Sequence, residues 1–300
     1  MSIVLRAAVI GAVPFLGACA GLIPTEYVQV VGSNDSMEPS QFFAAAYTDD
    51  GETDLIEHLL GNGLTGFVGN SDGTVSEVRV RFDNEDEVVY VSIGGGAEIV
   101  YDDFGKGDFE DDEGWIEIAN AAAQYAYFEF NGYEPSQIEL DDEGTGAESD
   151  GYFGAETAHI ALPTETATYH GYWDAEGHTG TSGIEAGGHM GLAVGFGSGN
   201  ITGYAEGGFN AWNDDTETED GGSFVGGITG SVVGSRIAGT MSVDGDASGD
   251  IDLMGAIYGE EGEFAAGGIG GSLTSEAGEL NLGGDFFLYN EGGEGPCCFD

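Results

Sequence analysis

Positively charged residues are nearly missing from this 300-residue chain. Five Lys and Arg stand against 55 Asp and Glu, a formal net charge of −50 at pH 7. A field of this sign repels a phosphate backbone, so the composition excludes nucleic acid as a partner. Two interpretations remain. The acidic charge either attracts a cationic partner or suits a protein of saline water, where screening limits self-repulsion, and the second is the simpler because it needs no ligand.

Cysteine is as scarce as positive charge. Cys297 and Cys298 are adjacent and lie near the end of the chain. Neighbouring cysteines bridge poorly, because disulfide geometry constrains both backbone and side chains, so this pair cannot staple the fold and receives no assigned role. The third, Cys19, follows an apolar run over residues 7–16 that is too short to span a bilayer. No other apolar run in the sequence is long enough to span a bilayer, so we expect the rest of the chain to be a soluble body.

The first 19 residues have the pattern of a lipoprotein export signal. Arg6 precedes the apolar run, and Leu-Gly-Ala leads directly into Cys19. A charged start, a short apolar middle and small residues before a cleavage point are typical of secretion, and the cysteine is the residue that lipoprotein processing acylates. We predict a signal peptide over residues 1–18, a lipid on Cys19 and a tether over residues 19–40. The alternatives are an ordinary signal peptide with a chance cysteine, or a short membrane anchor.

The residue after Cys19 bears on localisation. It is Ala20, and no Asp stands there to argue for retention in the inner membrane. We therefore expect a protein of the cell outer membrane, held by its lipid and able to face the cell surface.

Residues 41–160 are expected to form a β-rich first domain. Runs of Val, Ile, Tyr and Phe separated by turn residues favour strands. The predicted strands are Leu64 to Val68, Val75 to Phe82, Glu87 to Ile93, Ala97 to Tyr101 and Gln124 to Asn131. A short helix is predicted from Ser40 and a further strand over residues 27–31. The acidic clusters at 83–87, 102–113 and 141–150 are expected to be mostly solvated loops.

From residue 161 to 290 the pattern changes to that of a barrel, with residues 291–300 as a tail. Glycine becomes dense, and short strands recur between turns. Bulky residues alternate with small ones, so that one face of each strand is large and the other small. The large residues that share a face are Met190, Leu192, Val194 and Phe196; Phe224 and Ile228; Ile237, Met241 and Val243; Ile251, Leu253 and Ile257; and Phe286 and Leu288. This alternation predicts a sheet closed around a filled interior.

A membrane-spanning barrel is the competing interpretation of the same alternation. Such a barrel needs an apolar outer band with aromatic girdles. The second face here is Gly, Ala, Ser and Thr, which a lipid environment would stabilise little. The soluble barrel is therefore favoured.

Several of these segments resemble the barrel of transferrin-binding protein B. Phe153 to Thr157, Leu162-Pro163-Thr164 and Ala167 to Gly171 are similar to the entry of that barrel, which runs Leu-Pro, a gap, then Ala-x-Tyr-x-Gly. The stretch from Leu192 to Gly203 resembles its second hairpin. Gly255 to Gly259, Glu263 and Gly267-Gly268 resemble its Gly-x-Phe-Tyr-Gly-Pro block, the Glu and the Gly-Gly pair that follow it.

The resemblance covers residues 153–288 and is that of a divergent member. Ile257 replaces the usual aromatic residue, Glu260 stands where Pro is usual, and Ile269 stands near the final Phe. The resemblance implies a mainly β fold, with a handle domain before a soluble eight-stranded antiparallel barrel. It also implies binding of an iron-carrier protein, haemoglobin, haem or a complement regulator. Variable loops perform that binding, so no binding residue is carried over and the cofactor-binding residues stay unassigned.

Candidate chemical sites are few. Three histidines lie near the first two barrel strands. We expect His170 within a strand, His178 in a turn and His189 at a strand start. Nothing in their spacing indicates that they bind a haem or a metal together. The segment 244–250 alternates Asp with small residues but lacks the full calcium pattern, so a hairpin turn is favoured. No nucleophile elbow, zinc-protease motif or phosphate loop is present. We predict no catalytic residue, no metal and no cofactor.

The leading functional hypothesis is a lipid-anchored binding protein that captures an iron-carrier protein or haem for an outer-membrane receptor. It depends on the lipoprotein signal and the barrel resemblance together. The alternative is a structural or adhesive surface lipoprotein with no small ligand.

Overall fold

The computed structural model describes residues 64–83, 88–110, 113–131, 135–159, 161–179, 182–213, 218–259, 261–276 and 278–290. All regular structure in these ranges is β, arranged as an open sheet followed by a closed barrel. The prediction of a mainly β fold is confirmed. No helix long and apolar enough to cross a membrane occurs among the described residues. Cys19, the predicted helix from Ser40, the strand over 27–31 and the Cys297–Cys298 pair lie outside them.

The first layer is a nine-stranded antiparallel sheet in the order β4-β3-β2-β1-β9-β8-β7-β6-β5. Its strands are β1 (Leu64–Asn70), β2 (Val75–Asp83), β3 (Val88–Ile93), β4 (Ile99–Tyr101), β5 (Asp103–Glu110), β6 (Glu113–Ala119), β7 (Gln124–Asn131), β8 (Ser136–Asp142) and β9 (Ala147–Gly154). The five predicted strands are confirmed as β1, β2, β3, β4 and β7. The expectation of loops over 102–113 and 141–150 is wrong, because β5, the start of β6 and parts of β8 and β9 occupy these acidic stretches.

The two edge strands of this sheet are consecutive in the chain. β4 ends at Tyr101 and β5 begins at Asp103, and the amide of Asp102 donates to the carbonyl of Ala119 at 3.1 Å. The sheet therefore curls around its own core instead of lying flat. Buried Val, Ile and Phe side chains from most of its strands fill that core, including Phe128 against Phe153 with ring centroids 5.7 Å apart.

The second layer is a closed eight-stranded antiparallel barrel, as predicted. Its strands are β10 (Thr166–Thr179), β11 (Ser182–Gly195), β12 (Asn200–Asn213), β13 (Thr218–Val233), β14 (Arg236–Gly245), β15 (Ser248–Tyr258), β16 (Phe264–Ser275) and β17 (Gly278–Asn290). β10 pairs with both β11 and β17, which closes the ring.

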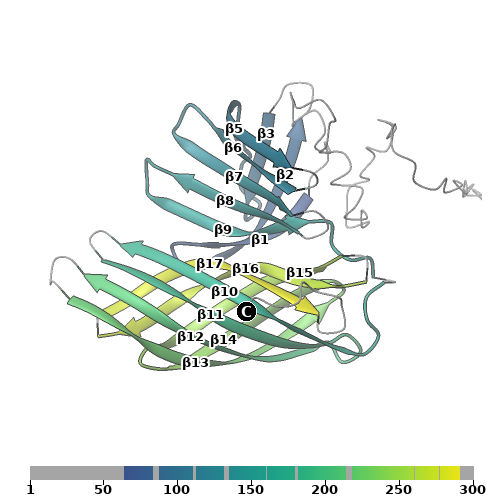
Figure 1. The fold of residues 1–300 in the computed structure, drawn as a ribbon, viewed down its shortest axis with the longest axis vertical. Helices are drawn as coiled ribbons and strands as arrows, with labels where there is room; N and C mark the ends of the chain where they lie inside the picture. The colour runs from purple at the N-terminus through teal and green to yellow at the C-terminus, as the bar shows by residue number, and fades with distance from the viewer. Residues whose placement is uncertain are drawn as a thin grey trace, which may run out of the picture.

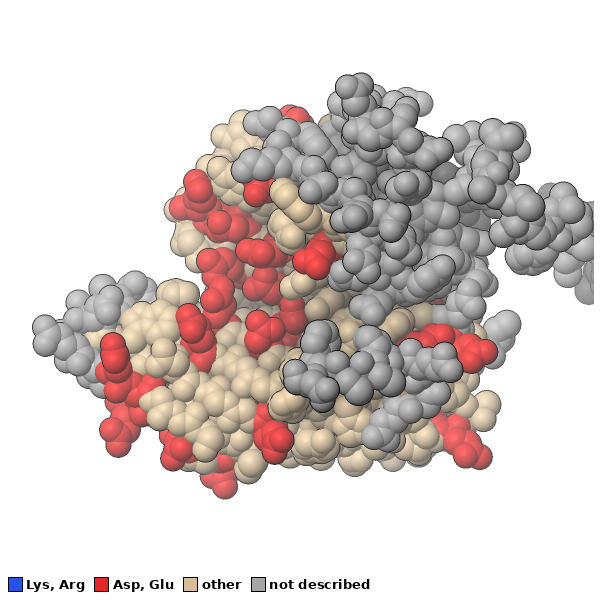
Figure 2. Space-filling view, viewed as in Figure 1, with Lys and Arg blue, Asp and Glu red and all other residues tan. Residues whose placement is uncertain are grey.

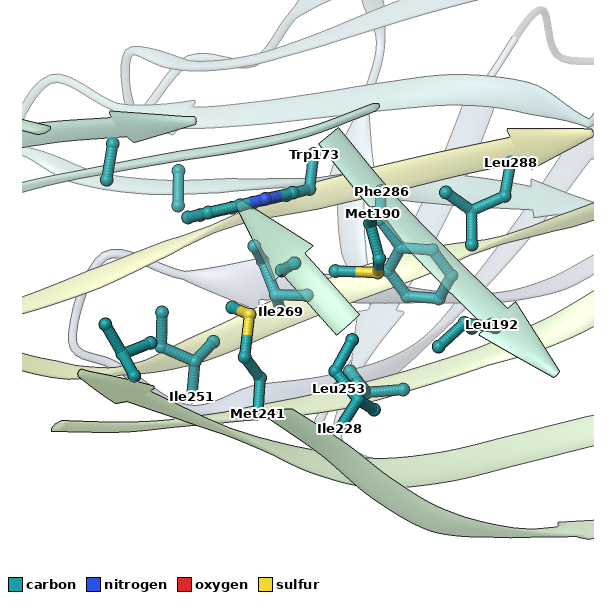
Figure 3. Packing of buried hydrophobic residues seen from close by; sticks show 14 of the residues in the cluster. Trp173, Met190, Leu192, Ile228, Met241, Ile251, Leu253, Ile269, Phe286 and Leu288 are labelled. Carbon is teal, nitrogen blue, oxygen red and sulfur yellow. The ribbon is translucent and has the colours of Figure 1, made fainter. Parts of the chain in front are cut away.

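The barrel interior is filled with side chains (Figure 3). Trp173, Met190, Met241 and Phe286 point into it from different strands and are at most 1% exposed. The bulky residues assigned to one face from the sequence belong to this core, except Phe196, which is partly buried and packs against it. Eight strands leave an interior just wide enough for such packing.

Carboxylates occupy the outer face of the barrel. Glu206, Asp244, Asp250 and Asp252 are exposed there. Charges at these positions are unfavourable in lipid, so the pattern disfavours the membrane-spanning alternative.

The sheet packs directly onto the barrel through β1 and β9 (Figure 1). Phe67 of β1 is buried against Ala256, Tyr258 and Ala266 of the barrel. Glycine lets the backbones approach: a Cβ on Gly268 would lie 2.3 Å from the carbonyl carbon of Val68. Because such a distance is far inside van der Waals contact, any larger residue would force the two layers apart.

Candidate functional site

A cleft of about 720 Å³ opens between the sheet and the barrel. β8 and β9 of the sheet form one wall, and β10, β11, β12, β13 and β17 of the barrel form the other. Its charged lining residues are six carboxylates, and no Lys or Arg is among the described residues that line it. They are Glu139, Asp150, Asp174, Glu176, Glu185 and Asp285. Figure 2 shows acidic side chains gathered where the two layers meet, with no basic surface among the coloured residues on this face.

Strand register places these carboxylates directly opposite one another. Glu139 pairs with Asp150 across β8 and β9. Asp174 pairs with Asp285 across β10 and β17, and Glu176 pairs with Glu185 across β10 and β11. Like charges at directly opposed positions destabilise a sheet. Three such pairs facing one cleft therefore oppose folding unless protons or a bound cation neutralise them.

The cleft carboxylates differ in their burial. Glu139, Asp174 and Glu185 are exposed, and Asp150 is half-buried. Asp285 is only 7% exposed and accepts one hydrogen bond from Nε2 of Gln137 at 3.3 Å. A surface built for saline water keeps its acids hydrated, whereas Asp285 has lost most of its water. The general acidity of the chain therefore does not explain the burial of Asp285.

The pKa shifts within the cleft all run upward. Burial, and then the charges of Glu139 and Glu176, raise the pKa of Asp150 to about 8. Burial, with Asp174 and Asp150 as neighbours, holds the pKa of Asp285 well above its usual range. Burial is also the largest cause of the raised pKa values of Glu139, Asp174 and Glu176. The cleft therefore retains protons at neutral pH that isolated carboxyl groups would release.

Glu176 has two further charged neighbours. After burial, the charge of Glu148 on β9 also raises the pKa of Glu176, and His178 partly offsets this. Repulsion between acids therefore extends from β10 of the barrel to β9 of the sheet.

A different part of the same interface shows how positive charge neutralises such acids. Arg236 of β14 lies 2.9 Å from Glu156 and 3.3 Å from Glu77 of β2. Glu156 also accepts from Thr65 at 3.2 Å and from the hydroxyl of Ser235. Arg236 is the one Lys or Arg of the sequence from residue 161 onward. These contacts of Arg236 join the layers, and no Lys or Arg is among the described residues that line the cleft.

The arrangement suits cation binding better than catalysis. Acid–base enzymes push the pKa values of paired groups apart, so that one is acid and the other base. Here every resolved shift in the cleft has the same direction. No group of three or more His, Cys, Asp or Glu in the described part of the chain has a geometry that could hold a metal ion. The cleft instead matches extended cations that place several charges along a wall, such as Lys and Arg side chains.

The three histidines do not converge. His170 lies within β10 as predicted, but His178 also lies within β10 and His189 within the middle of β11, so their predicted positions in a turn and at a strand start are wrong. All three point outward, each against an aromatic ring, at centroid distances of 6.2, 5.3 and 4.7 Å respectively. Residues 244–250 form the hairpin predicted for them, between β14 and β15.

Sequence reasoning missed the cleft. Asp174 and Glu176 stand two residues apart, so they share a face of β10, and this signal was visible in the sequence. Asp285 lies 111 residues after its partner Asp174, and Glu185 lies 9 residues after its partner Glu176. Only the strand register places each of them opposite its partner. The sheet wall could not be placed at all, because β8 and β9 were expected to be partly loop.

Comparison with known proteins gives a weak structural likeness. No family model matches the sequence, and no curated protein matches it. Two crystal structures of the vaccine antigen transferrin-binding protein B from Haemophilus parasuis Hp5, a single and a double mutant, match 72% of this chain. The TM-scores are 0.40 and 0.37, with 13% and 12% identity, and the chain spans 50% of the length of each.

Proposed function

We propose that this chain is a binding protein that holds a cationic surface of a partner protein in the cleft between sheet and barrel. The observation that carries the proposal is the set of three directly opposed carboxylate pairs, on two layers, with no basic residue along the described walls. Lys or Arg side chains entering the cleft would relieve the repulsion within each pair. Binding then recovers free energy that the empty protein loses.

The same electrostatics rank the ligands that the resemblance to transferrin-binding protein B implies. Haem carries anionic propionates, which the cleft carboxylates repel. A protein with a basic surface, such as an iron carrier passed to an outer-membrane receptor, fits the cleft better. Acylation of Cys19 would hold the binding protein at the outer membrane, where such a partner is met. We also propose that the tether ends at residue 40, the first domain at residue 160 and the barrel domain at residue 290.

A structural or adhesive lipoprotein without a ligand is the alternative. In that case the cleft would bind cations no better than any other acidic surface of the molecule. The carboxylates outside the cleft supply the matched comparison.

Calorimetric titration of the chain with a hexa-lysine peptide at pH 7 and about 150 mM salt tests the proposal. A cleft variant combines Asp150→Asn, Asp174→Asn and Glu176→Gln. Its control removes the same charge from exposed positions, with Asp102→Asn, Asp244→Asn and Glu219→Gln. We expect the cleft variant to bind at least about tenfold more weakly, which corresponds to about 1.4 kcal/mol. The control should change affinity less than twofold, and equal losses in both variants would overturn the proposal.

A further inference from the structure

An exposed aromatic patch lies on the outer wall of the barrel beside the cleft. Tyr172 is 54% exposed, Tyr204 50% and Val225 62%, and these are three of the five most exposed large hydrophobic residues in the described ranges. Register places Tyr172, His189, Glu206 and Val225 side by side across β10, β11, β12 and β13. Large apolar side chains grouped on an otherwise hydrophilic face indicate a contact surface.

The Tyr204 and His170 rings lie over Gly191 of β11. A Cβ on Gly191 would come within 2.6 Å of the Tyr204 ring and 2.9 Å of Nδ1 of His170, so this glycine gives the two rings room to lie over the strand. The Tyr172 and His189 rings are 4.7 Å apart, centroid to centroid. Covering a glycine accounts for the position of Tyr204. It does not account for the exposure of Tyr172 and Val225.

The patch continues into the cleft along a single strand. Tyr172, Asp174 and Glu176 occupy successive outward positions of β10, so the ring of Tyr172 adjoins the first cleft carboxylates. Glu206 adds an exposed carboxylate inside the patch. A partner crossing this surface meets aromatic faces first and then a row of acids.

We propose that the patch selects arginine, so that the partner is a protein segment rich in Arg, with guanidinium groups stacked on Tyr172 and Tyr204 while neighbouring cations enter the cleft. The argument for this occupant is charge complementarity together with the exposure of the two tyrosine rings beside the cleft. Arginine stacks on aromatic faces and is weakly hydrated, whereas the lysine ammonium is a compact, strongly hydrated charge. This inference rests on the proposed function and adds the chemical identity of the partner segment.

The test compares hexa-arginine with hexa-lysine on the full chain at about 150 mM salt. The variant Tyr172→Leu with Tyr204→Leu keeps apolar bulk and removes the aromatic faces, and Tyr125→Leu in the first sheet is the control. We expect the double variant to bind hexa-arginine about 5- to 30-fold more weakly, from two cation–π contacts. Its affinity for hexa-lysine should fall less than about threefold, and the control should match the unmodified chain.

The outcomes separate the two proposals. Loss confined to hexa-arginine supports the patch as an arginine-selective surface. If the unmodified chain binds both peptides with equal affinity, and the double variant does the same, this inference is overturned and the proposed function still stands. Failure of both peptides to bind the unmodified chain would overturn the proposed function itself.

Discussion

Asp150 should destabilise the folded protein at alkaline pH, and replacing it with Asn should remove that penalty. Asn keeps the shape of the protonated carboxyl group and cannot ionise. The folded-state pKa of about 8 lies above the ordinary value of 3.8. A group of this kind stabilises the fold fully below its unfolded pKa and loses that contribution as pH rises through its folded pKa. The protein with Asp150 should therefore lose stability between about pH 4 and pH 8.

The size of the effect follows from the same shift. Each pH unit between the two values corresponds to about 1.4 kcal/mol, so the upper limit is about 6 kcal/mol. Asp150 is half-buried, and solvent screening together with proton sharing among its neighbours reduces this figure. We expect Asp150→Asn to increase the free energy of unfolding by about 2 to 3 kcal/mol at pH 9. This increase would raise the midpoint of thermal unfolding by roughly 5 to 10 °C for a chain of this size.

Thermal and chemical unfolding at pH 5 and pH 9 would measure it, since both values avoid the isoelectric point near 4.1. Asp244→Asn, which removes the same charge from an exposed position, is the control and should change stability by less than about 0.5 kcal/mol at either pH. A stabilisation by Asp150→Asn that is equal at pH 5 and pH 9, or absent at pH 9, would refute the electrostatic account of the cleft.

Three further predictions concern the interface and the anchor. Arg236→Ala should destabilise by about 3 to 5 kcal/mol in chemical unfolding, because Glu156 would stay buried without its partner, and adding Glu156→Gln should recover part of the loss; no recovery would contradict this. Gly268→Ala should cost about 2 kcal/mol or more, since its Cβ would meet β1, while Gly227→Ala, with no atom within 4 Å of its Cβ, should be nearly neutral; equal effects would argue against close layer packing. Cys19→Ala should release the protein from membrane fractions, and an unmodified Cys19 in mass spectra would refute lipid anchoring.

The barrel was predictable because its physics is local. Bulky side chains at alternate positions, as in Met190, Leu192 and Val194, identify strands whose large face must be buried. Closure of the ring then buries all of these faces in one core. The glycines were interpreted only as barrel composition, although Gly268 also allows the sheet to pack on the barrel.

The first sheet was only half predictable, because β5 and β9 contradict their local composition. Residues 103–110 and 147–151 are rich in Asp, Glu and Gly, which favour loops in isolation. Pairing with β6, β8 and β1 overrides that preference. The cleft depends on these strands and on long-range register, so its carboxylate pairs could not be derived from the sequence.

Protons released on binding provide the most direct test of a cation-binding cleft. A cation beside a carboxyl group lowers its pKa, so a group such as Asp150, which is largely protonated at pH 7, should lose its proton when hexa-lysine binds. Calorimetric titration at pH 7 in phosphate and in Tris, buffers with different ionisation enthalpies, counts those protons. We predict net proton release by the unmodified chain and a clear reduction in the Asp150→Asn variant. Binding with identical heats in both buffers would show that the peptide contacts only acids already ionised, and would contradict a cleft that binds cations.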